Sequence, residues 1–272
     1  KESIEKVNDN PYRLADDIWG IGFKTADSIA SKMGYGKNDL RRCRSGILYT
    51  LNQLADEGHC YAEEEQLVAV ARQLLEAEET SIREAIRGMI EAEELVLEDE
   101  AIYLPPFYYA ECGVAHRLTA LAKASDDQLF KADFDLERLQ RETGIEYDEV
   151  QAQAIRQAID SKVLVLTGGP GTGKTTTTRA MIAAFQSAGL KILLAAPTGR
   201  AAKRMSEATG MEAKTLHRLL EYNPKDGYKR NDERPLEGDV LSVDECSMID
   251  IILMNNLTKA LPVSMRLVLV GD

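Results

Sequence analysis

The sequence predicts an α/β fold, with a parallel β-sheet domain in the C-terminal half and a mainly α-helical region before it. After residue 150, strand-like apolar runs alternate with helical patterns, as in a parallel sheet covered by helices on both faces. Before that point, apolar residues recur mostly at helical spacing. The composition, 44% hydrophobic and 29% charged, excludes disordered, collagen-like and disulfide-rich classes.

The chain has 272 residues and a net charge of −12. Its longest apolar runs, such as VLVL at 163–166 and KILLAAP at 191–197, are far shorter than the roughly 18 residues of a membrane span. The cysteines form no CxxC pair, which predicts free thiols in a reducing compartment, the cytoplasm. Lys1 begins no targeting leader, and the final RLVLVGD resembles a buried strand, so we expect a piece of a longer protein.

Acidic residues are concentrated in the middle of the chain. Residues 1–60 carry 9 basic and 9 acidic side chains, residues 61–160 carry 9 and 24, and residues 161–272 carry 15 and 12. Nucleic acid therefore remains a possible partner at both ends. The alternative is that the asymmetry serves only solubility and repulsion between solvated helix faces.

Residues 10–36 predict a helix-hairpin-helix, the first domain at 1–40, in which two short helices flank the turn GIG. Apolar residues at helical spacing support it: Leu14, Ile18, Ala26, Ile29 and Ala30. Backbone amides at such a turn can bind a DNA phosphate independently of base sequence. The candidate DNA contacts are Gly20, Gly22, Lys24 and Thr25. The alternative is a plain interhelical turn, with Ile21 filling the core.

Residues 41–124 predict a winged-helix-like module. Its expected elements are helices at 41–57, 63–78 and 81–93, followed by two short apolar runs about a polar turn in LVLEDEAIYL. Acidic residues gather at this wing: Glu91, Glu93, Glu94, Glu98, Asp99 and Glu100. Because they repel phosphate, a scaffold or protein-contact role is favoured over DNA binding. We expect Pro105 and Pro106 to end the module, a helix at 110–124, and an acidic connector at 125–148.

The predicted sheet domain, residues 149–272, has strands at 162–167, 190–196, 239–243 and 266–270. The string GGPGTGKT at 168–175 matches GxxxxGK[ST] between a strand and a helical run, the context of a phosphate-binding P-loop. The candidate nucleotide contacts are Gly168, Gly169, Pro170, Gly171, Thr172, Gly173, Lys174, Thr175 and Thr176. Lys174 suits the β and γ phosphates of ATP, and the Thr175 hydroxyl suits Mg²⁺.

A carboxylate pair follows the predicted strand at 239–243, in the string VLSVDE. Asp244 is the candidate second metal ligand, and Glu245 the catalytic residue that polarises an attacking water. Oxygen ligands of this kind also tolerate Mn²⁺, and nothing in the sequence suggests zinc.

Together, DECSM at 244–248, APTGRAA at 196–202, TLHRLL and LTGGPGTGKTTT resemble superfamily 1 helicases, most closely the RecD-like, exodeoxyribonuclease V alpha-subunit family. The resemblance implies an ATP-dependent 5′-to-3′ DNA helicase of bacterial repair or recombination, with residues 149–272 as the first, truncated RecA-like motor domain. Its partners would be single-stranded DNA and duplex ends or forks. The second motor domain is missing after Asp272, so we expect slow hydrolysis by this piece, since an arginine from such a partner contributes roughly 10³ to 10⁵ in rate.

The resemblance also assigns residue roles. Gln151 matches the adenine-reading glutamine. The loop of Pro197, Thr198, Gly199 and Arg200 matches a contact to single-stranded DNA. A second DNA-side element is matched by Thr215 and His217, although His217 could equally be a partly buried structural histidine. Gly271 and Asp272 match the opening of a motif that couples phosphate sensing to DNA.

Two other functions remain open from the sequence. One is a helix-hairpin-helix DNA-binding adaptor with a regulatory ATP site. The other is a P-loop NTPase that acts on a protein or small molecule without nucleic acid.

Overall fold

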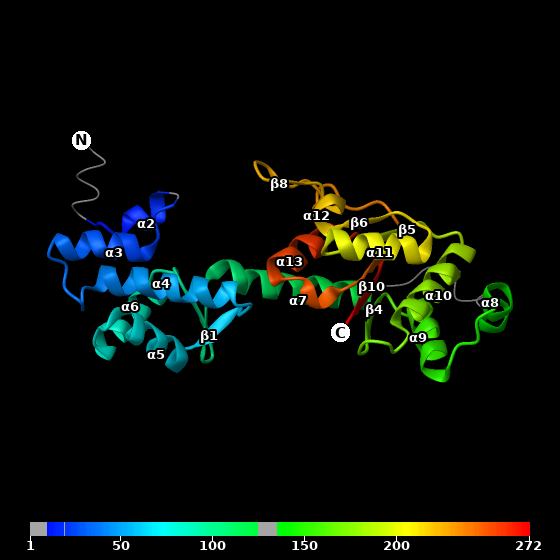
Figure 1. Cartoon of the computed structure of the whole chain (residues 1–272), viewed down its shortest axis with the longest axis horizontal. Helices are drawn as coiled ribbons and strands as arrows, with labels where there is room; N and C mark the ends of the chain where they lie inside the picture. The colour runs from blue at the N-terminus through cyan, green and yellow to red at the C-terminus, as the bar shows by residue number, and fades with distance from the viewer. Residues whose placement is uncertain (1–9, 19, 125–134) are drawn as a thin grey trace. The chain divides into compact units, whose positions relative to one another are not determined.

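The computed structural model describes residues 10–18, 20–124 and 135–272. They divide into two compact units, residues 1–109 and residues 110–272 (Figure 1). Each unit has its own hydrophobic core.

The N-terminal unit is mainly helical. Its elements are α2 (Arg13–Asp17), α3 (Phe23–Lys32), α4 (Leu40–Asp56), β1 (Tyr61–Glu63), α5 (Glu64–Leu75), α6 (Glu79–Glu91), β2 (Val96–Glu98) and β3 (Ala101–Tyr103). The three predicted helices after residue 40 are confirmed, and Ile47, Leu67 and Ile82 from them are fully buried in one core. Of the apolar residues noted at helical spacing, Ile18 lies outside the helix: it follows the end of α2 and is 45% exposed.

The predicted hairpin is present as β2 and β3, which pair antiparallel. A third strand, β1, pairs with the other side of β3, placing Tyr61 opposite Tyr103. Strand β1 was not predicted, because its three residues give too short a pattern. The acidic residues Glu98, Asp99 and Glu100 are exposed at the turn of this hairpin, where they disfavour phosphate.

Helix α7 (Pro105–Lys123) begins five residues earlier than predicted. Pro105 and Pro106 therefore start a helix rather than separate two elements. The first turn of a helix has amide groups with no intrahelical acceptor, so a residue without an N–H group is tolerated there.

The C-terminal unit contains a five-stranded parallel sheet in the order β4-β10-β9-β5-β6, which confirms the predicted fold class. The strands are β4 (Val163–Thr167), β5 (Ile192–Ala196), β6 (Ala213–Thr215), β9 (Val240–Val243) and β10 (Arg266–Gly271). The helices are α8 (Leu136–Thr143), α9 (Glu149–Asp160), α10 (Lys174–Ser187), α11 (Gly199–Thr209), α12 (Leu216–Leu219) and α13 (Ile251–Lys259). A short hairpin, β7 (Tyr222–Asn223) and β8 (Gly227–Tyr228), and a 3₁₀ turn at Cys246–Met248 complete the unit.

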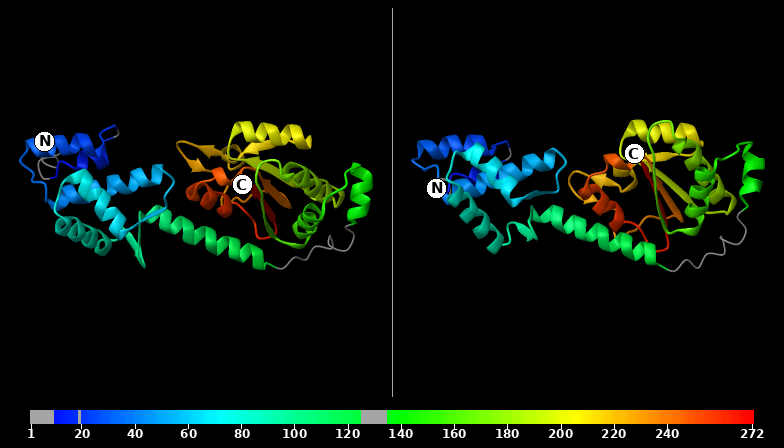
Figure 2. Two further views of the ribbon diagram at one scale, coloured as in Figure 1. Left: turned by 60° about the horizontal axis from the view of Figure 1, so that its bottom comes forward. Right: turned by 90° about the horizontal axis from the view of Figure 1, so that it is seen from below.

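Two cores lie on opposite faces of this sheet, because successive residues of a strand point to opposite sides. In β10, Val268 and Val270 join the core that contains residues of α9, α10 and α11. Leu267 and Leu269 join the core that contains residues of α7, α12 and α13. The sheet is therefore covered on both faces, as predicted (Figure 2).

The segment expected as a connector, residues 125–148, includes the helix α8. The Asp135 side chain caps this helix by accepting from the Glu137 amide at 2.9 Å, and Leu139 is buried in the core of α9 and α10. Residues 125–134 of the expected connector lie outside the described residues.

All four cysteines are free thiols, as expected. Within the described ranges, no helix combines the length and the apolarity needed to cross a membrane.

Candidate functional site

The carboxyl ends of the parallel strands bring most of the predicted site residues to one edge of the sheet. Thr167 at the end of β4 pairs with Gly271, and Leu269 of β10 pairs with Val243. The P-loop, the Asp244–Glu245 pair, the 197–200 loop and the Thr215–His217 segment each follow directly after a strand at this edge. Ligands of open parallel sheets bind at this location.

The P-loop runs from β4 into α10. Gly171 and Gly173 have φ angles of 79° and 83°, in the left-handed region that favours glycine. Gly173 is also the N-cap of α10 and offers no capping side chain. The first amides of α10 therefore face the loop, an arrangement that attracts a phosphate.

The Lys174 ammonium lies inside this loop. It donates to the carbonyl oxygens of Gly168 and Gly169, the latter at 3.2 Å. It also forms an ion pair with Asp272 Oδ1 at 2.5 Å. The P-loop and the end of β10 thus meet at one ammonium group, on a side chain that is 20% exposed.

Asp244 lies next to this charge cluster. Its partial burial raises the pKa of the carboxyl group, and the nearby Glu245 charge raises it further, while the Glu245 amide, Arg204 and Lys174 oppose the shift. The amide of Glu245 donates to Asp244 Oδ1 at 2.9 Å. A partly buried carboxyl group with a raised pKa at the end of a strand is a candidate functional group.

The donor set fits Mg²⁺. Asp244 supplies a carboxylate oxygen and Thr175 an exposed hydroxyl. Among the described residues, no group of three or more His, Cys, Asp or Glu side chains could hold a metal alone. Mg²⁺ is commonly bound by one or two protein oxygens, with phosphates and waters as its other ligands.

Glu245 has a left-handed backbone with a φ angle of 54°, which is strained for a residue with a side chain. Its carboxylate accepts a hydrogen bond from Arg204 Nη2 of α11 at 2.7 Å. The side chain of Glu245 is 31% exposed and that of Arg204 is 62% exposed.

Gln151 lies against the P-loop from α9. Its amide nitrogen occupies the space that a Cβ at Gly173 would need. Its Oε1 accepts from the Asp148 amide at 3.2 Å, and Asp148 Oδ1 accepts from the Gln151 amide at 2.8 Å, which together form a capping box. The donor end of the side chain is therefore placed at the nucleotide loop, and its acceptor end starts α9.

The loop at 197–200 leads into α11. Thr198 caps this helix by accepting from the Ala201 amide at 3.2 Å. Gly199 and Arg200 are exposed, whereas Pro197 is half-buried. The arginine and the loop backbone are thus accessible to a ligand at the same sheet edge.

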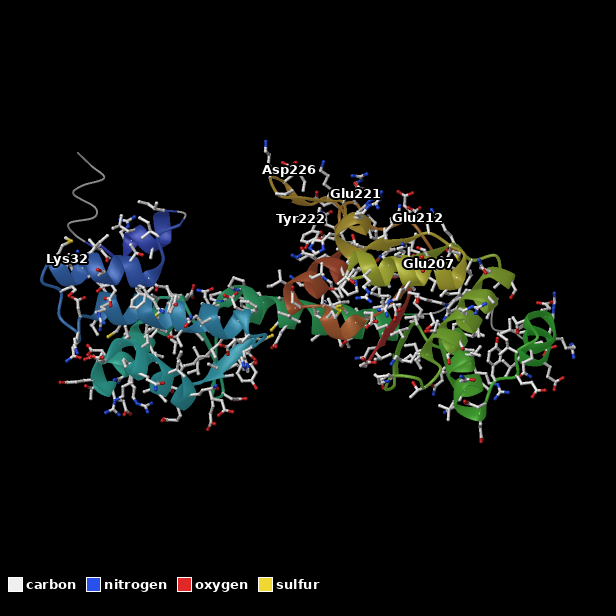
Figure 3. The ribbon with its side chains drawn as sticks, in the orientation of Figure 1. Lys32, Glu207, Glu212, Glu221, Tyr222 and Asp226 are labelled. Atoms are coloured by element: carbon white, nitrogen blue, oxygen red, sulfur yellow. The ribbon has the colours of Figure 1, made fainter. Side chains whose placement is uncertain are left out.

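Thr215 and His217 start α12. Thr215 Oγ1 accepts from the Arg218 amide at 3.3 Å, so this hydroxyl caps the start of α12. The His217 side chain is exposed rather than partly buried. Its ring contacts Tyr222 and Tyr228 of the β7–β8 hairpin, with centroids 5.4 and 5.9 Å apart; Figure 3 labels Tyr222.

In the N-terminal unit, the residues predicted to contact phosphate are grouped at one turn. Gly20 has a φ angle of 91°, and Gly22 is the N-cap of α3 without a side-chain cap. Their neighbours Lys24 and Thr25 are exposed. Ile21 is only half-buried, so it does not fill a core as the alternative of a plain turn expected.

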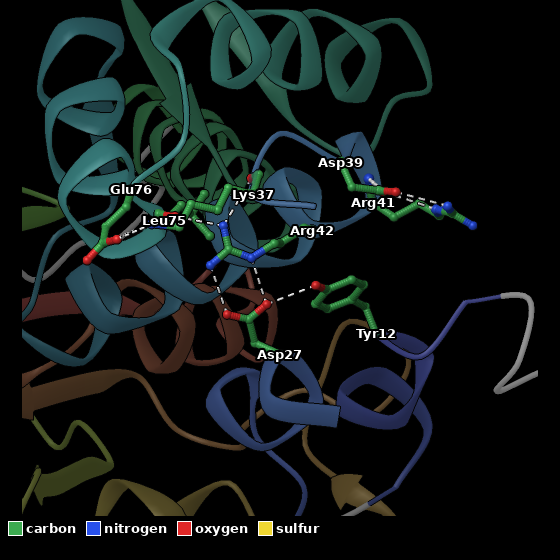
Figure 4. Close-up of polar contacts among 8 residues, drawn as sticks. All are labelled: Tyr12, Asp27, Lys37, Asp39, Arg41, Arg42, Leu75 and Glu76. Atoms are coloured by element: carbon green, nitrogen blue, oxygen red, sulfur yellow. Dashed lines mark hydrogen bonds and ion pairs between the residues drawn. The ribbon is translucent and has the colours of Figure 1, made fainter. Parts of the chain in front are cut away.

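Asp27 fixes α3 to α4. It accepts two hydrogen bonds from Arg42, Nε to Oδ1 at 2.8 Å and Nη2 to Oδ2 at 2.9 Å. It also accepts from the Tyr12 hydroxyl at 2.8 Å. Arg42 Nη1 donates to the carbonyl oxygens of Lys37 and Leu75 (Figure 4). The guanidinium group of Arg42, in α4, is therefore bonded to Asp27 in α3, to Lys37 between α3 and α4, and to Leu75 at the end of α5.

Three contacts were not found from the sequence: Lys174 with Asp272, Arg204 with Glu245, and the bidentate pair described above. Each joins residues far apart in the chain, and no local spacing indicates such a pair. The one available signal was the four-residue spacing of Arg200 and Arg204, which places both on one helix face.

Two family models and several known proteins are similar to parts of this chain. Residues 1–61 match the model of the ATP-dependent RecD2 DNA helicase HHH domain, and residues 151–272 match an AAA domain. The ATP-dependent RecD2 DNA helicase of Deinococcus radiodurans is 36% identical over 287 residues, which cover all of this chain and 39% of that protein. The RecBCD enzyme subunit RecD of Haemophilus influenzae is 41% identical over 147 residues, 45% of this chain and 23% of its own length.

Among solved structures, the Pif1 helicase of Candida albicans is 27% identical over 47% of this chain and 33% of that chain, with a TM-score of 0.35. A likeness of this size carries no argument about function. The chain thus spans well under half the length of the curated relatives named above.

Proposed function

We propose, since residues 1–61 match the RecD2 helicase HHH domain model and residues 151–272 match an AAA domain, that this chain is part of an ATP-dependent DNA helicase of bacterial recombination or repair. The observation that carries the proposal is the single sheet edge at which the P-loop, the Asp244–Glu245 pair and the 197–200 loop gather. A motor needs its hydrolysis site and its DNA contact on one rigid frame, and under this proposal the edge would hold both.

In the proposed mechanism, the N–H groups of residues 168–176 other than Pro170, together with the Lys174 ammonium, hold the phosphates of ATP. Gln151 orients the adenine by donating from its amide. Thr175 and Asp244 would hold Mg²⁺, which would neutralise phosphate charge when bound. Glu245 orients the attacking water and accepts its proton.

The proposed DNA contacts are polar groups at two places in the chain. At the sheet edge they are the 197–200 loop, Thr215 and His217. In the N-terminal unit they are the amides around Gly20 and Gly22, with Lys24 and Thr25. The exposed start of α3, which has no side-chain cap, suits a DNA backbone phosphate whatever the base sequence.

The substrates within this proposal are single-stranded DNA and duplex ends or forks, with movement from 5′ to 3′. A second motor domain, which would bring arginines to the γ-phosphate, belongs to the same proposal. Duplexes that carry a 5′ or a 3′ single-stranded tail test the direction, since a 5′-to-3′ motor unwinds only the former.

The test of the proposed function is ATP hydrolysis by the full-length protein with and without single-stranded DNA. We expect DNA to raise the rate and Lys174→Ala to abolish it. Hydrolysis that ignores DNA would instead favour an NTPase that acts on another substrate. Tight DNA binding without any turnover would favour a helix-hairpin-helix adaptor in which ATP is only a regulator.

A further inference from the structure

We propose that Arg204 is a positioning residue that holds the Glu245 carboxylate until nucleic acid binds, and so couples DNA binding on α11 to ATP hydrolysis. This inference rests on the proposed function, because it takes Glu245 as the group that orients water and the 197–200 loop as a DNA contact. It adds a residue that no sequence motif assigned and a reason for hydrolysis to respond to DNA.

The first observation is the contact itself. Arg204 Nη2 donates to Glu245 Oε1 at 2.7 Å, a short charge-assisted hydrogen bond that directs the carboxylate toward α11. The main chain of Glu245 is fixed at the same time. Its amide donates to Asp244 Oδ1 at 2.9 Å, and its carbonyl accepts from the Met248 amide at 3.1 Å. A change at Glu245 can therefore be confined to its side chain.

The second observation is where Arg204 lies. Helix α11 starts at Gly199, directly after the proposed DNA-contacting residues, and its inward face is packed against the sheet. The buried residues of that face are Ala201, Ala202 and Met205. Arg200 and Arg204 are exposed and four residues apart, so they are neighbours on the solvent face of one helix.

This face can serve a phosphate and the carboxylate in turn. Figure 3 labels Glu207, a further exposed residue about one turn after Arg204. A phosphodiester that reaches Arg200 is close to Arg204 as well, and guanidinium groups bind phosphate in a bidentate manner. The Arg204–Glu245 pair is largely exposed on the arginine side, and exposed ion pairs are weak enough to be exchanged.

The exchange changes what Glu245 can do. While it is paired with Arg204, its carboxylate is directed to α11 and its negative charge is balanced. Once a DNA phosphate takes Arg204, the carboxylate is free to accept a hydrogen bond from the attacking water. DNA binding would then raise kcat for ATP without changing the contacts of the nucleotide.

The test uses the full-length protein and measures kcat and KM for ATP, without DNA and at saturating oligothymidylate. Arg204→Gln should raise the DNA-free kcat by up to about fivefold, the factor set by an exposed ion pair, and should reduce the stimulation by DNA by the same factor. The KM for ATP should not change, because the hydrogen bond of Arg204 is to Glu245 rather than to the P-loop. Arg204→Lys, which keeps the charge, should restore part of the stimulation.

Lys203→Gln is the matched control. Lys203 is adjacent on α11 and is also exposed, but its ion-pair partner is Glu207 at 3.9 Å. This variant removes one positive charge from the same helix without touching Glu245, and it should keep the wild-type ratio of stimulated to basal rate.

Two results would overturn the inference. If Arg204→Gln left the basal rate and the stimulation by DNA unchanged, the Arg204–Glu245 contact would be an ion pair with no effect on hydrolysis. A lower basal rate would mean that Arg204 holds Glu245 in its productive position. Each of these results is read against two conditions: wild-type hydrolysis responds to DNA, and Glu245→Gln abolishes hydrolysis. If either condition is not met, it is the proposed function that fails.

Discussion

Replacing Asp27 by alanine should destabilise the N-terminal unit, because this carboxylate supports three hydrogen bonds that join α3 to its surroundings. The Arg42 side chain is 13% exposed and that of Asp27 is 22% exposed, while Tyr12 is 1% exposed. Without the carboxylate, two nitrogens of Arg42 and the Tyr12 hydroxyl lose their acceptor in poorly solvated positions.

The expected cost follows from this geometry. Breaking a fully buried ion pair costs about 3–5 kcal/mol, and the partial exposure of Asp27 together with the remaining acceptors of Arg42, Lys37 O and Leu75 O, reduces it. We expect the free energy of unfolding to fall by about 2–4 kcal/mol. Urea unfolding followed by circular dichroism measures the change, and hydrogen exchange of the α3 and α4 amides locates it.

Two variants serve as controls. Asp27→Asn keeps an acceptor oxygen and should lose less stability than Asp27→Ala. Asp56→Ala makes the same change at an exposed position on α4 and should shift stability by no more than about 0.5 kcal/mol. If Asp27→Ala were as mild as Asp56→Ala, the Arg42 pair would not be what holds α3 in place.

Two further predictions concern local backbone and charge. Gly173→Ala should lower the free energy of unfolding by about 1–2 kcal/mol, because a φ of 83° is strained for alanine and the added Cβ would displace Gln151. Gly169→Ala is the control and should be nearly neutral, because a Cβ there would meet no atom within 4 Å. Equal shifts of the melting temperature in the two variants would contradict this prediction. Arg41 lowers the pKa of Asp39 below its ordinary 3.8 by a hydrogen bond to the Asp39 side chain. Asp39→Asn should therefore lower the free energy of unfolding by about 0.3–1 kcal/mol at neutral pH. The difference from the wild type should shrink as the pH falls below 3.8, and a difference that grew in acid would refute the prediction.

The sequence predicted the strands of the large sheet and the P-loop because each is a local pattern. VLVLT and VLSV are largely apolar runs, as expected for strands of a parallel sheet. VLSV forms the fully buried β9, whereas VLVLT forms the edge strand β4, where Val165 is 61% exposed. The glycines at 171 and 173 are needed for a left-handed backbone, and that need is visible in the motif itself.

Other features could not be predicted because their causes are not local. Strands β1 and β6 have three residues each and form only where a partner strand is already in place. The start of α7 at Pro105 depends on which of two prolines begins the helix. The contact of Arg204 with Glu245 and that of Lys174 with Asp272 arise from the strand order, which brings distant segments to one edge.

The central claim is that the loop at 168–175 binds the phosphates of a nucleotide. Calorimetric titration of the protein with Mg·ATP analogues, in the wild type and in Lys174→Ala, tests it most directly, with exposed Lys203→Ala as the control for charge. Loss of a charged hydrogen bond to phosphate, about 1.5–3 kcal/mol, predicts an affinity roughly tenfold to a hundredfold weaker in Lys174→Ala only. Equal affinities in all three proteins, or no saturable binding in the wild type, would contradict the claim.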